Sequence, residues 1–193
     1  PILTFRPSKS GKAYQKIWDK DNHGSPLRKF TINQTSKLKK IFESYKNISI
    51  EYAMRYGTPE IEKTLNKMTK KGCSKILLVP LYPQYAASTS ATVKDEVFKW
   101  MLKQRWQPDL RTIAPWFDNH NYIKALAETV KKNIINKNKL DKLIVSFHGI
   151  PKRYFMAGDP YHCHCIKSAR LLKEELKWPD DKILVTFQSR FGP

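Results

Sequence analysis

Short apolar runs rich in β-branched residues recur along the chain, and each is followed by a longer amphipathic segment. The apolar runs cover residues 48–54, 75–82, 142–147 and 182–187. Such runs are typical of buried strands, and the segments between them are typical of helices. Strands that alternate with helices become parallel strands joined by right-handed crossovers. The pattern therefore predicts an α/β fold of the Rossmann-like class, with doubly wound parallel sheets flanked by helices.

Three dipeptides mark expected helix starts. Ser25-Pro26, Thr58-Pro59 and Asp159-Pro160 each place a capping side chain before a proline. A Ser, Thr or Asp side chain accepts from the first free N–H groups of a helix, and proline suits the first helical position. Gly72 is expected to end the helix that starts near Pro59.

The pattern breaks over residues 108–121, where a short apolar run, 111–114, leads into Pro115 and Trp116 and a polar cluster follows. That cluster is a candidate cap for the next helix. We expect a Rossmann-like domain over 1–116 that lacks its first strand, and the truncated start of a similar domain over 117–193. Pro1 at the beginning, and an apolar run just before the other end, predict that both ends are cut from a longer chain.

Composition narrows the class of protein. Hydrophobic residues make up 40% and aromatic residues 12% of the chain, which excludes a disordered protein. No apolar run approaches the roughly 18 to 20 residues of a membrane-spanning helix, and no signal segment opens the sequence. Three cysteines in such a chain argue against a disulfide framework. We expect a cytoplasmic protein with reduced thiols.

The net charge of +19 favours contact with polyanions such as nucleic acid or an anionic membrane. The lysines, however, are spread through nearly every segment and fall on expected solvated helix faces. A lysine-rich soluble surface accounts for the charge at least as well. A basic α/β binding module therefore stays open as an alternative to an enzyme.

The usual motifs of this fold class are absent. The sequence has no Gly-x-Gly-x-x-Gly or Walker loop, and no Gly-x-Ser-x-Gly or His-Glu-x-x-His. This argues against dehydrogenases, ATPases and the commonest hydrolases. Ligands of such sheets bind beyond the carboxyl ends of the strands. The segments expected there, 55–58, 82–85, 148–151 and 188–191, carry polar and aromatic groups that suit a flat, anionic ligand.

Two runs carry a resemblance to a known family. They are Leu-Val-Pro-Leu-Tyr-Pro-Gln-Tyr at 78–85, with Ser88-Thr89 after it, and Ser-Phe-His-Gly-Ile-Pro at 146–151, followed by Gly-Asp-Pro-Tyr at 158–161. With supporting runs at 24–26, 55–59 and 187–193, the sequence resembles the ferrochelatases along its whole length. The resemblance implies a chelatase-type fold and a lyase-type metal chelatase that inserts ferrous iron into protoporphyrin IX to form haem.

His148 is the candidate catalytic and metal-binding residue. Metal insertion requires a base beside the porphyrin to take the pyrrole protons, and a neutral imidazole can accept a proton or bind a metal. His148 follows an expected strand and should project from the sheet edge. The resemblance implies that it is the family's catalytic histidine; the alternative is a histidine that only caps its strand. The resemblance also places an acidic partner, a glutamate, beyond Pro193, so the fragment alone is expected to be inactive.

By resemblance, Arg6, Ser25, Arg55 and Tyr56 are candidates for binding the porphyrin, and Tyr82 is a further candidate from its place in the second strand-end segment. Arginine suits the propionate carboxylates, and aromatic side chains suit the walls of the site. The alternatives are a surface arginine at position 6, a fold-stabilising turn at 55–56, and packing roles for Tyr82 and its neighbour Tyr85.

The run His-Cys-His-Cys at 162–165 contains ligand types for zinc or an iron–sulfur cluster. Residues two apart on a helix diverge by about 200°, so these side chains cannot all face one metal. Some ferrochelatases hold a two-iron cluster with a mid-chain cysteine, but that position here is Ala87. A different cluster that uses Cys163 and Cys165 stays open, beside the simpler reading of unliganded thiols.

Other properties stay open. Imidazole binds most divalent first-row metals, so a related chelatase that uses cobalt, or coproporphyrin in place of protoporphyrin, is the runner-up. The apolar substrate and basic surface predict peripheral membrane association at the inner face of the membrane. We expect no nucleic-acid partner, and the sequence leaves the oligomeric state open.

Overall fold

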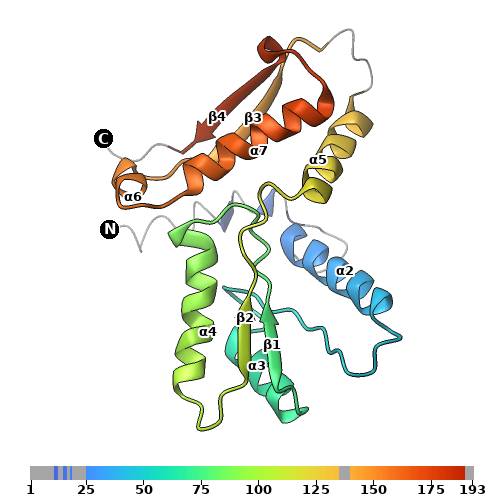
Figure 1. Ribbon diagram of the computed structural model, residues 1–193, viewed down its shortest axis with the longest axis vertical. Coiled ribbons are helices and arrows are strands. Elements are labelled where there is room, and N and C mark those ends of the chain that lie inside the picture. The colour runs from blue at the N-terminus through green and yellow to red at the C-terminus, as the bar shows by residue number, and fades with distance from the viewer. Residues whose placement is uncertain (1–10, 13–14, 17, 19–24, 135–139, 190–193) are drawn as a thin grey trace. The chain divides into compact units, whose positions relative to one another are not determined.

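The computed structural model describes residues 11–12, 15–16, 18, 25–134 and 140–189. The chain divides into two compact units, Pro1–Cys73 and Ser74–Pro193. Figure 1 traces the helices and strands of each unit. No helix among the described residues is long and apolar enough to span a membrane.

The first unit contains helices α2 (Pro26–Ile41) and α3 (Ile61–Lys70). Helix α2 begins with Pro26 after Ser25, as predicted. The predicted start of α3 at Pro59 is wrong, because the helix begins at Ile61 after Glu60. Its predicted end is confirmed.

Gly72 ends α3 because it adopts the left-handed conformation, with φ +86°. Its N–H donates to Thr69 O at 2.9 Å, and the N–H of Cys73 donates to Met68 O at 3.1 Å. This pair of bonds is the Schellman pattern, which satisfies the last carbonyls of a helix.

The predicted strand at 48–54 is wrong. Among the described residues it contributes only an isolated parallel bridge, between Met54 and Glu60. A strand exists through hydrogen bonds to a neighbouring strand, and the Met54 N–H instead donates to nearby Pro59 O at 2.8 Å. An ion pair also holds the segment, since Glu51 Oε1 lies 3.0 Å from Lys67 Nζ. The segment at 55–58 therefore does not leave a strand end.

The second unit begins with a β-α-β arrangement. Strands β1 (Lys75–Leu78) and β2 (Asp109–Thr112) are parallel, and α4 (Thr92–Leu102) connects them after a π-helical turn, Ala87–Ala91. Strand β1 is shorter than predicted, because Pro80 has no backbone N–H to donate to a neighbouring strand. Ile76, Val97 and Trp100 form buried parts of this region.

A second parallel pair follows, formed by β3 (Leu143–His148) and β4 (Ile183–Gln188). Between them lie α6 (Lys152–Met156), α7 (Tyr161–Leu176) and a 3-10 turn, Asp180–Lys182. Figure 1 shows α7 running along this pair of strands.

Helix α5 (His120–Asn133) precedes β3 and packs on α7. The predicted polar cap is confirmed, because Asn119 Oδ1 accepts from the N–H groups of Asn121 and Tyr122 at 3.0 and 3.3 Å. Ala127, Leu172 and Leu176 form the core between the helices and the sheet, and Leu143, Val145 and Ile183 pack against it.

The predicted α/β class is confirmed by the parallel strands and their helices. Among the described residues the strands form two separate pairs, β1 with β2 and β3 with β4. The predicted domain boundary between residues 116 and 117 falls between these pairs, inside the second compact unit. The boundary stays a prediction.

Candidate active site at the end of strand β3

His148 is the last residue of β3, and its side chain is exposed. It lies in register with Gln188, the last residue of β4. The ladder continues one step further, because the Gly149 N–H donates to Gln188 O at 2.6 Å. The imidazole therefore projects from a strand end whose backbone is held by hydrogen bonds to β4.

The contacts of the His148 ring define which nitrogen carries its proton. Nδ1 lies 2.7 Å from the carbonyl oxygen of Gly149, which can only accept. Nδ1 is therefore the protonated donor of the neutral ring, and the lone pair is on Nε2. The hydroxyl of Ser189 lies 3.0 Å from Nε2 and donates to it. The Nε2 lone pair therefore accepts a hydrogen bond from a hydroxyl donor that a ligand could replace.

Tyr161, the first residue of α7, contacts the same strand end. Its hydroxyl hydrogen-bonds to the backbone of His148 and to the thiol of Cys165, one turn further along the helix. Burial raises the pKa of Tyr161 to about 12. The phenol therefore stays neutral at physiological pH and acts as a hydrogen-bonding group at the backbone of His148.

Asp159 joins two segments that are far apart in the sequence. Its side chain is buried, with 9% exposed. Oδ1 accepts from the N–H of Tyr161 at 3.0 Å, and Oδ2 accepts from the N–H of Ala87 at 2.8 Å. The carboxylate thus satisfies the N–H of Tyr161, the first residue of α7, and the N–H of Ala87 in the π-helical turn after β1. The predicted helix start at Pro160 is wrong, because α7 begins at Tyr161 and Pro160 is its N-cap residue.

Two further contacts hold the segment after β1 on α7. His164 Nδ1 accepts from the Tyr85 N–H at 3.2 Å, and its ring stacks on Phe117 with 3.7 Å between centroids. Burial lowers the pKa of His164, so the ring is neutral and can accept this bond. Gln84 Nε2 donates to Ser168 Oγ at 3.0 Å. The predicted strand-end segment 82–85 is therefore fixed to the helix that supports His148.

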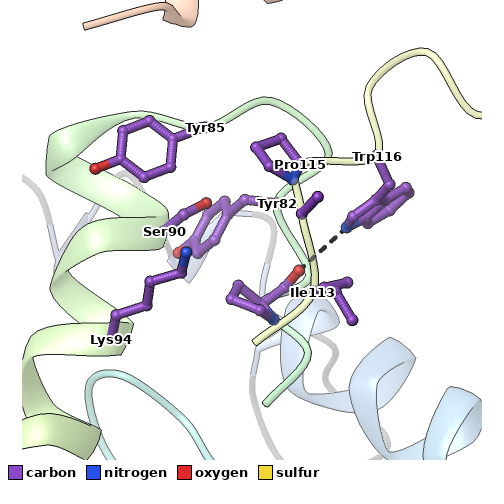
Figure 2. A pocket seen from close by; sticks show the side chains of 9 residues that line it. Tyr82, Tyr85, Ser90, Lys94, Ile113, Pro115 and Trp116 are labelled. Carbon is purple, nitrogen blue, oxygen red and sulfur yellow. Dashed lines mark hydrogen bonds between the residues drawn. The ribbon is translucent and has the colours of Figure 1, made fainter. Parts of the chain in front are cut away.

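Tyr82 lines an open hollow of about 210 Å³ beyond β1 and β2. Figure 2 shows this hollow with the tyrosine rings on one side and Trp116 on the other. The residues that line it are Pro80, Tyr82, Tyr85, Ser90, Lys94, Ile113, Ala114, Pro115 and Trp116. Tyr82 is 42% exposed, so its ring is available to a ligand.

The other predicted porphyrin residues belong to the first unit. Arg55 lies with its guanidinium carbon 4.5 Å from the centroid of the Tyr56 ring, and Tyr56 is 76% exposed. Ser25 precedes α2 and makes no side-chain capping bond. Arg6 lies outside the described residues. Ser25, Arg55 and Tyr56 therefore belong to the first unit, and Tyr82 and His148 belong to the second.

The run at 162–165 separates into different surroundings, as the helical spacing predicts. Cys163 is exposed and Cys165 is fully buried. His162 stacks on Phe187 at 5.1 Å, whereas His164 is held by Tyr85. Among the residues that the structure describes, no three His, Cys, Asp or Glu side chains are grouped to hold a metal. The structure does not bring Cys163 and Cys165 together.

Several residues of the site were missed by the sequence reasoning. Tyr161 and Asp159 belong to the Gly-Asp-Pro-Tyr run, which was noticed only as a resemblance and as a helix cap. Ser189 lies in the expected strand-end segment 188–191 but carried no assigned role. Lys94 offered no signal at all, because it is one of many lysines on helices.

Comparison with known proteins identifies the family of this chain. The ferrochelatase family profile matches residues 1–193 of this chain. The chain belongs to the ferrochelatase family. It is 52% identical to the ferrochelatase of Allorhizobium ampelinum and 50% identical to that of Rhizobium meliloti, in each case over all 193 residues. The match covers 56% and 57% of those ferrochelatases, so the chain spans little more than half their length.

A more distant ferrochelatase, from Brucella ovis, is 42% identical over the whole of this chain, and the match covers 55% of that ferrochelatase. Among solved structures, SirB from Bacillus subtilis with Fe3+ is similar with a TM-score of 0.60 and 18% identity. That match covers 89% of this chain and 64% of SirB. The likeness to SirB supports the chelatase-type fold.

Proposed function

We propose that this chain supplies the histidine-bearing part of a ferrochelatase, which inserts ferrous iron into protoporphyrin IX to form haem. The observation that carries the proposal is the Nε2 lone pair of His148, presented from a strand end with Nδ1 held by Gly149 O at 2.7 Å. Membership of the ferrochelatase family supports metal insertion as the reaction in which this nitrogen takes part.

In the proposed reaction, the porphyrin loses two pyrrole protons as its four nitrogens bind Fe2+. His148 Nε2 accepts a proton from the ring, or binds the incoming ion before it passes to the porphyrin. The Gly149 carbonyl stabilises the imidazolium, because Nδ1–H continues to donate to it when Nε2 is protonated. When Nε2 is protonated, the Ser189 hydroxyl accepts from it instead of donating, whereas a metal at Nε2 displaces the hydroxyl.

The flat substrate is proposed to lie against aromatic side chains and to be held at its propionates by cations and hydroxyls. Tyr82 in its hollow and Tyr56 beside Arg55 offer exposed rings of this kind. Arg6 and Ser25 remain further candidates for the propionates. A glutamate in the remaining length of the family's chains is proposed to be the acidic partner of His148.

Iron is the proposed metal, and the SirB structure with Fe3+ supports it for this fold. The runner-up is a chelatase of the same class that takes cobalt, or a coproporphyrin. We propose the lyase class for the enzyme. A cytoplasmic protein that contacts the inner face of the membrane is consistent with the net charge of +19 and with an apolar substrate.

The test uses the full-length protein, mixed anaerobically with Fe2+ and free-base protoporphyrin. The porphyrin absorption spectrum should convert to that of haem, and His148→Ala should abolish conversion while His120→Ala retains it. His120 is an exposed histidine at the start of α5, and it controls for loss of a surface imidazole. Full activity in His148→Ala would refute the assignment, and conversion with Co2+ alone would favour the runner-up.

A further inference from the structure

The hollow beside Tyr82 combines aromatic walls with a cation and a hydroxyl. Figure 2 shows the Lys94 ammonium directed from α4 toward the Tyr82 and Tyr85 rings, with the Ser90 hydroxyl on the same side. Trp116 lines the opposite side. The hollow is open to solvent, so a ligand group would enter it from outside. Apolar walls beside a cation and a hydroxyl suit one acidic arm of a larger ligand.

Lys94 is half-buried, and no contact in the described part of the chain neutralises its charge. Its Nζ lies 5.8 Å from the Tyr85 ring centroid, near the outer limit of about 6 Å for a cation–π contact. Among the described residues, no ion pair joins it to a carboxylate. By contrast, Lys99 on the same helix is paired with Glu96 at 3.0 Å. An ammonium in this setting favours an anionic partner from outside.

Ser90 adds a second polar group at the same place. It lies in the π-helical turn before α4 and is only 5% exposed. A hydroxyl beside an ammonium offers two donors to the two oxygens of a carboxylate. The aromatic walls then cover the hydrocarbon that carries that carboxylate.

The walls are fixed before any ligand binds. Trp116 Nε1 donates to Pro80 O at 3.3 Å, and the Trp116 N–H donates to Pro83 O at 3.1 Å. Its ring packs edge-on against Tyr122 with 5.0 Å between centroids. A preformed site loses little side-chain freedom on binding.

We propose that Lys94 and Ser90 form a carboxylate subsite that binds an acidic arm of a flat apolar ligand. In a porphyrin, this arm is a propionate. The assignment rests on the proposed function for the identity of that ligand. Lys94 thereby selects for carboxylated over esterified tetrapyrroles, and Tyr82 and Trp116 cover the arm.

The test is a fluorescence titration of the 193-residue chain with free-base protoporphyrin and, separately, with its dimethyl ester, in the same detergent. Lys94→Met should weaken binding of the diacid by about tenfold, the order expected for a charge-assisted hydrogen bond, and leave the ester unchanged. Lys94→Arg should restore much of the preference. Ser90→Ala should give a smaller loss for the diacid.

Lys99→Met is the matched control, because it removes the same charge from the same helix outside the hollow. Equal effects of Lys94→Met and Lys99→Met, equal loss of diacid and ester, or no binding of the diacid by the unaltered chain would each overturn the subsite. Iron insertion by the full-length protein separates the two proposals. If Lys94→Met weakens diacid binding selectively but the full-length protein inserts no iron, the subsite stands and the ferrochelatase function is refuted. If the full-length protein inserts iron but Lys94→Met does not weaken diacid binding selectively, the function stands and the subsite is refuted.

Discussion

Ser189 Oγ lies 3.0 Å from His148 Nε2, across the ends of the paired strands β3 and β4. Ser189 adopts φ +76°, a conformation that is strained for a residue with a side chain. Since Gly149 O fixes the proton on Nδ1, the serine hydroxyl is the donor to Nε2. A metal must displace this hydroxyl before it can bind.

Ser189→Ala should therefore raise the affinity of His148 for a divalent ion. A hydrogen bond of this kind contributes about 0.5–1.5 kcal/mol, which corresponds to roughly two- to tenfold in affinity. Titration with Co2+, followed by absorbance, measures the change. Ser146→Ala controls for loss of an exposed hydroxyl, because Ser146 is exposed on the strand that carries His148. A weaker affinity in Ser189→Ala would mean that the serine helps to hold the metal.

Asp159→Asn should destabilise the second unit. An amide has one acceptor oxygen, so its NH2 group must face the N–H of either Ala87 or Tyr161, both of which the carboxylate now accepts from. The unsatisfied buried donor costs about 1–3 kcal/mol. Urea unfolding measures the free energy of unfolding, with exposed Asp181→Asn as control. An unchanged midpoint would show that the carboxylate contributes nothing to the packing.

His164 should make stability fall in mild acid. Burial lowers its folded pKa below the ordinary value of 6.5; Asp118 and Asp159 oppose this shift and Lys167 reinforces it. Between the folded pKa and 6.5 the unfolded chain binds more protons, so its contribution to stability is present above pH 6.5 and is lost as the pH falls below it. Protonation of Nδ1 also breaks the bond from the Tyr85 N–H.

Free energies of unfolding at pH 7.5 and 5.5 measure the effect. His164→Asn keeps an acceptor near the Tyr85 N–H but cannot be protonated, so it should lose less stability on acidification than the unaltered chain. An equal loss in both proteins would assign the pH dependence to other groups.

The cysteines of α7 should differ sharply in reactivity. Cys163 is exposed, whereas Cys165 is fully buried and burial raises its pKa to about 11. Since thiolates are the reactive form, an aromatic disulfide reagent at pH 8 should modify Cys163 rapidly and Cys165 only on unfolding. Absorbance of the released thiol follows the reaction. A fast phase that survives in Cys163→Ser and disappears in Cys165→Ser would contradict the burial of Cys165.

Local chemistry predicted the parts of this fold that depend on neighbouring residues. The proline at the start of α2, the Asn119 cap and the Gly72 stop each act within a few positions. The placement of His148 at a strand end is of the same kind, since an apolar run followed by His-Gly predicts it. The strand at 48–54 failed for the opposite reason, because an apolar run does not reveal whether a partner strand lies beside it.

The contacts that build the site join residues far apart in the sequence. Tyr85 and His164 are 79 positions apart, and Ala87 and Asp159 are 72 apart. Neither pair has a spacing that a helix or strand period would connect. Lys94 shows the same limit, because only the hollow distinguishes it among the 36 Lys and Arg residues of the chain.

The most direct test of the central claim is nuclear magnetic resonance of the chain with 15N-labelled histidine, assigned with His148→Ala and titrated with Zn2+ as a diamagnetic probe. We expect free His148 to carry its proton on Nδ1, and the metal to shift the Nε2 signal of this ring. A proton on Nε2, or a metal bound at Nδ1, would contradict this expectation.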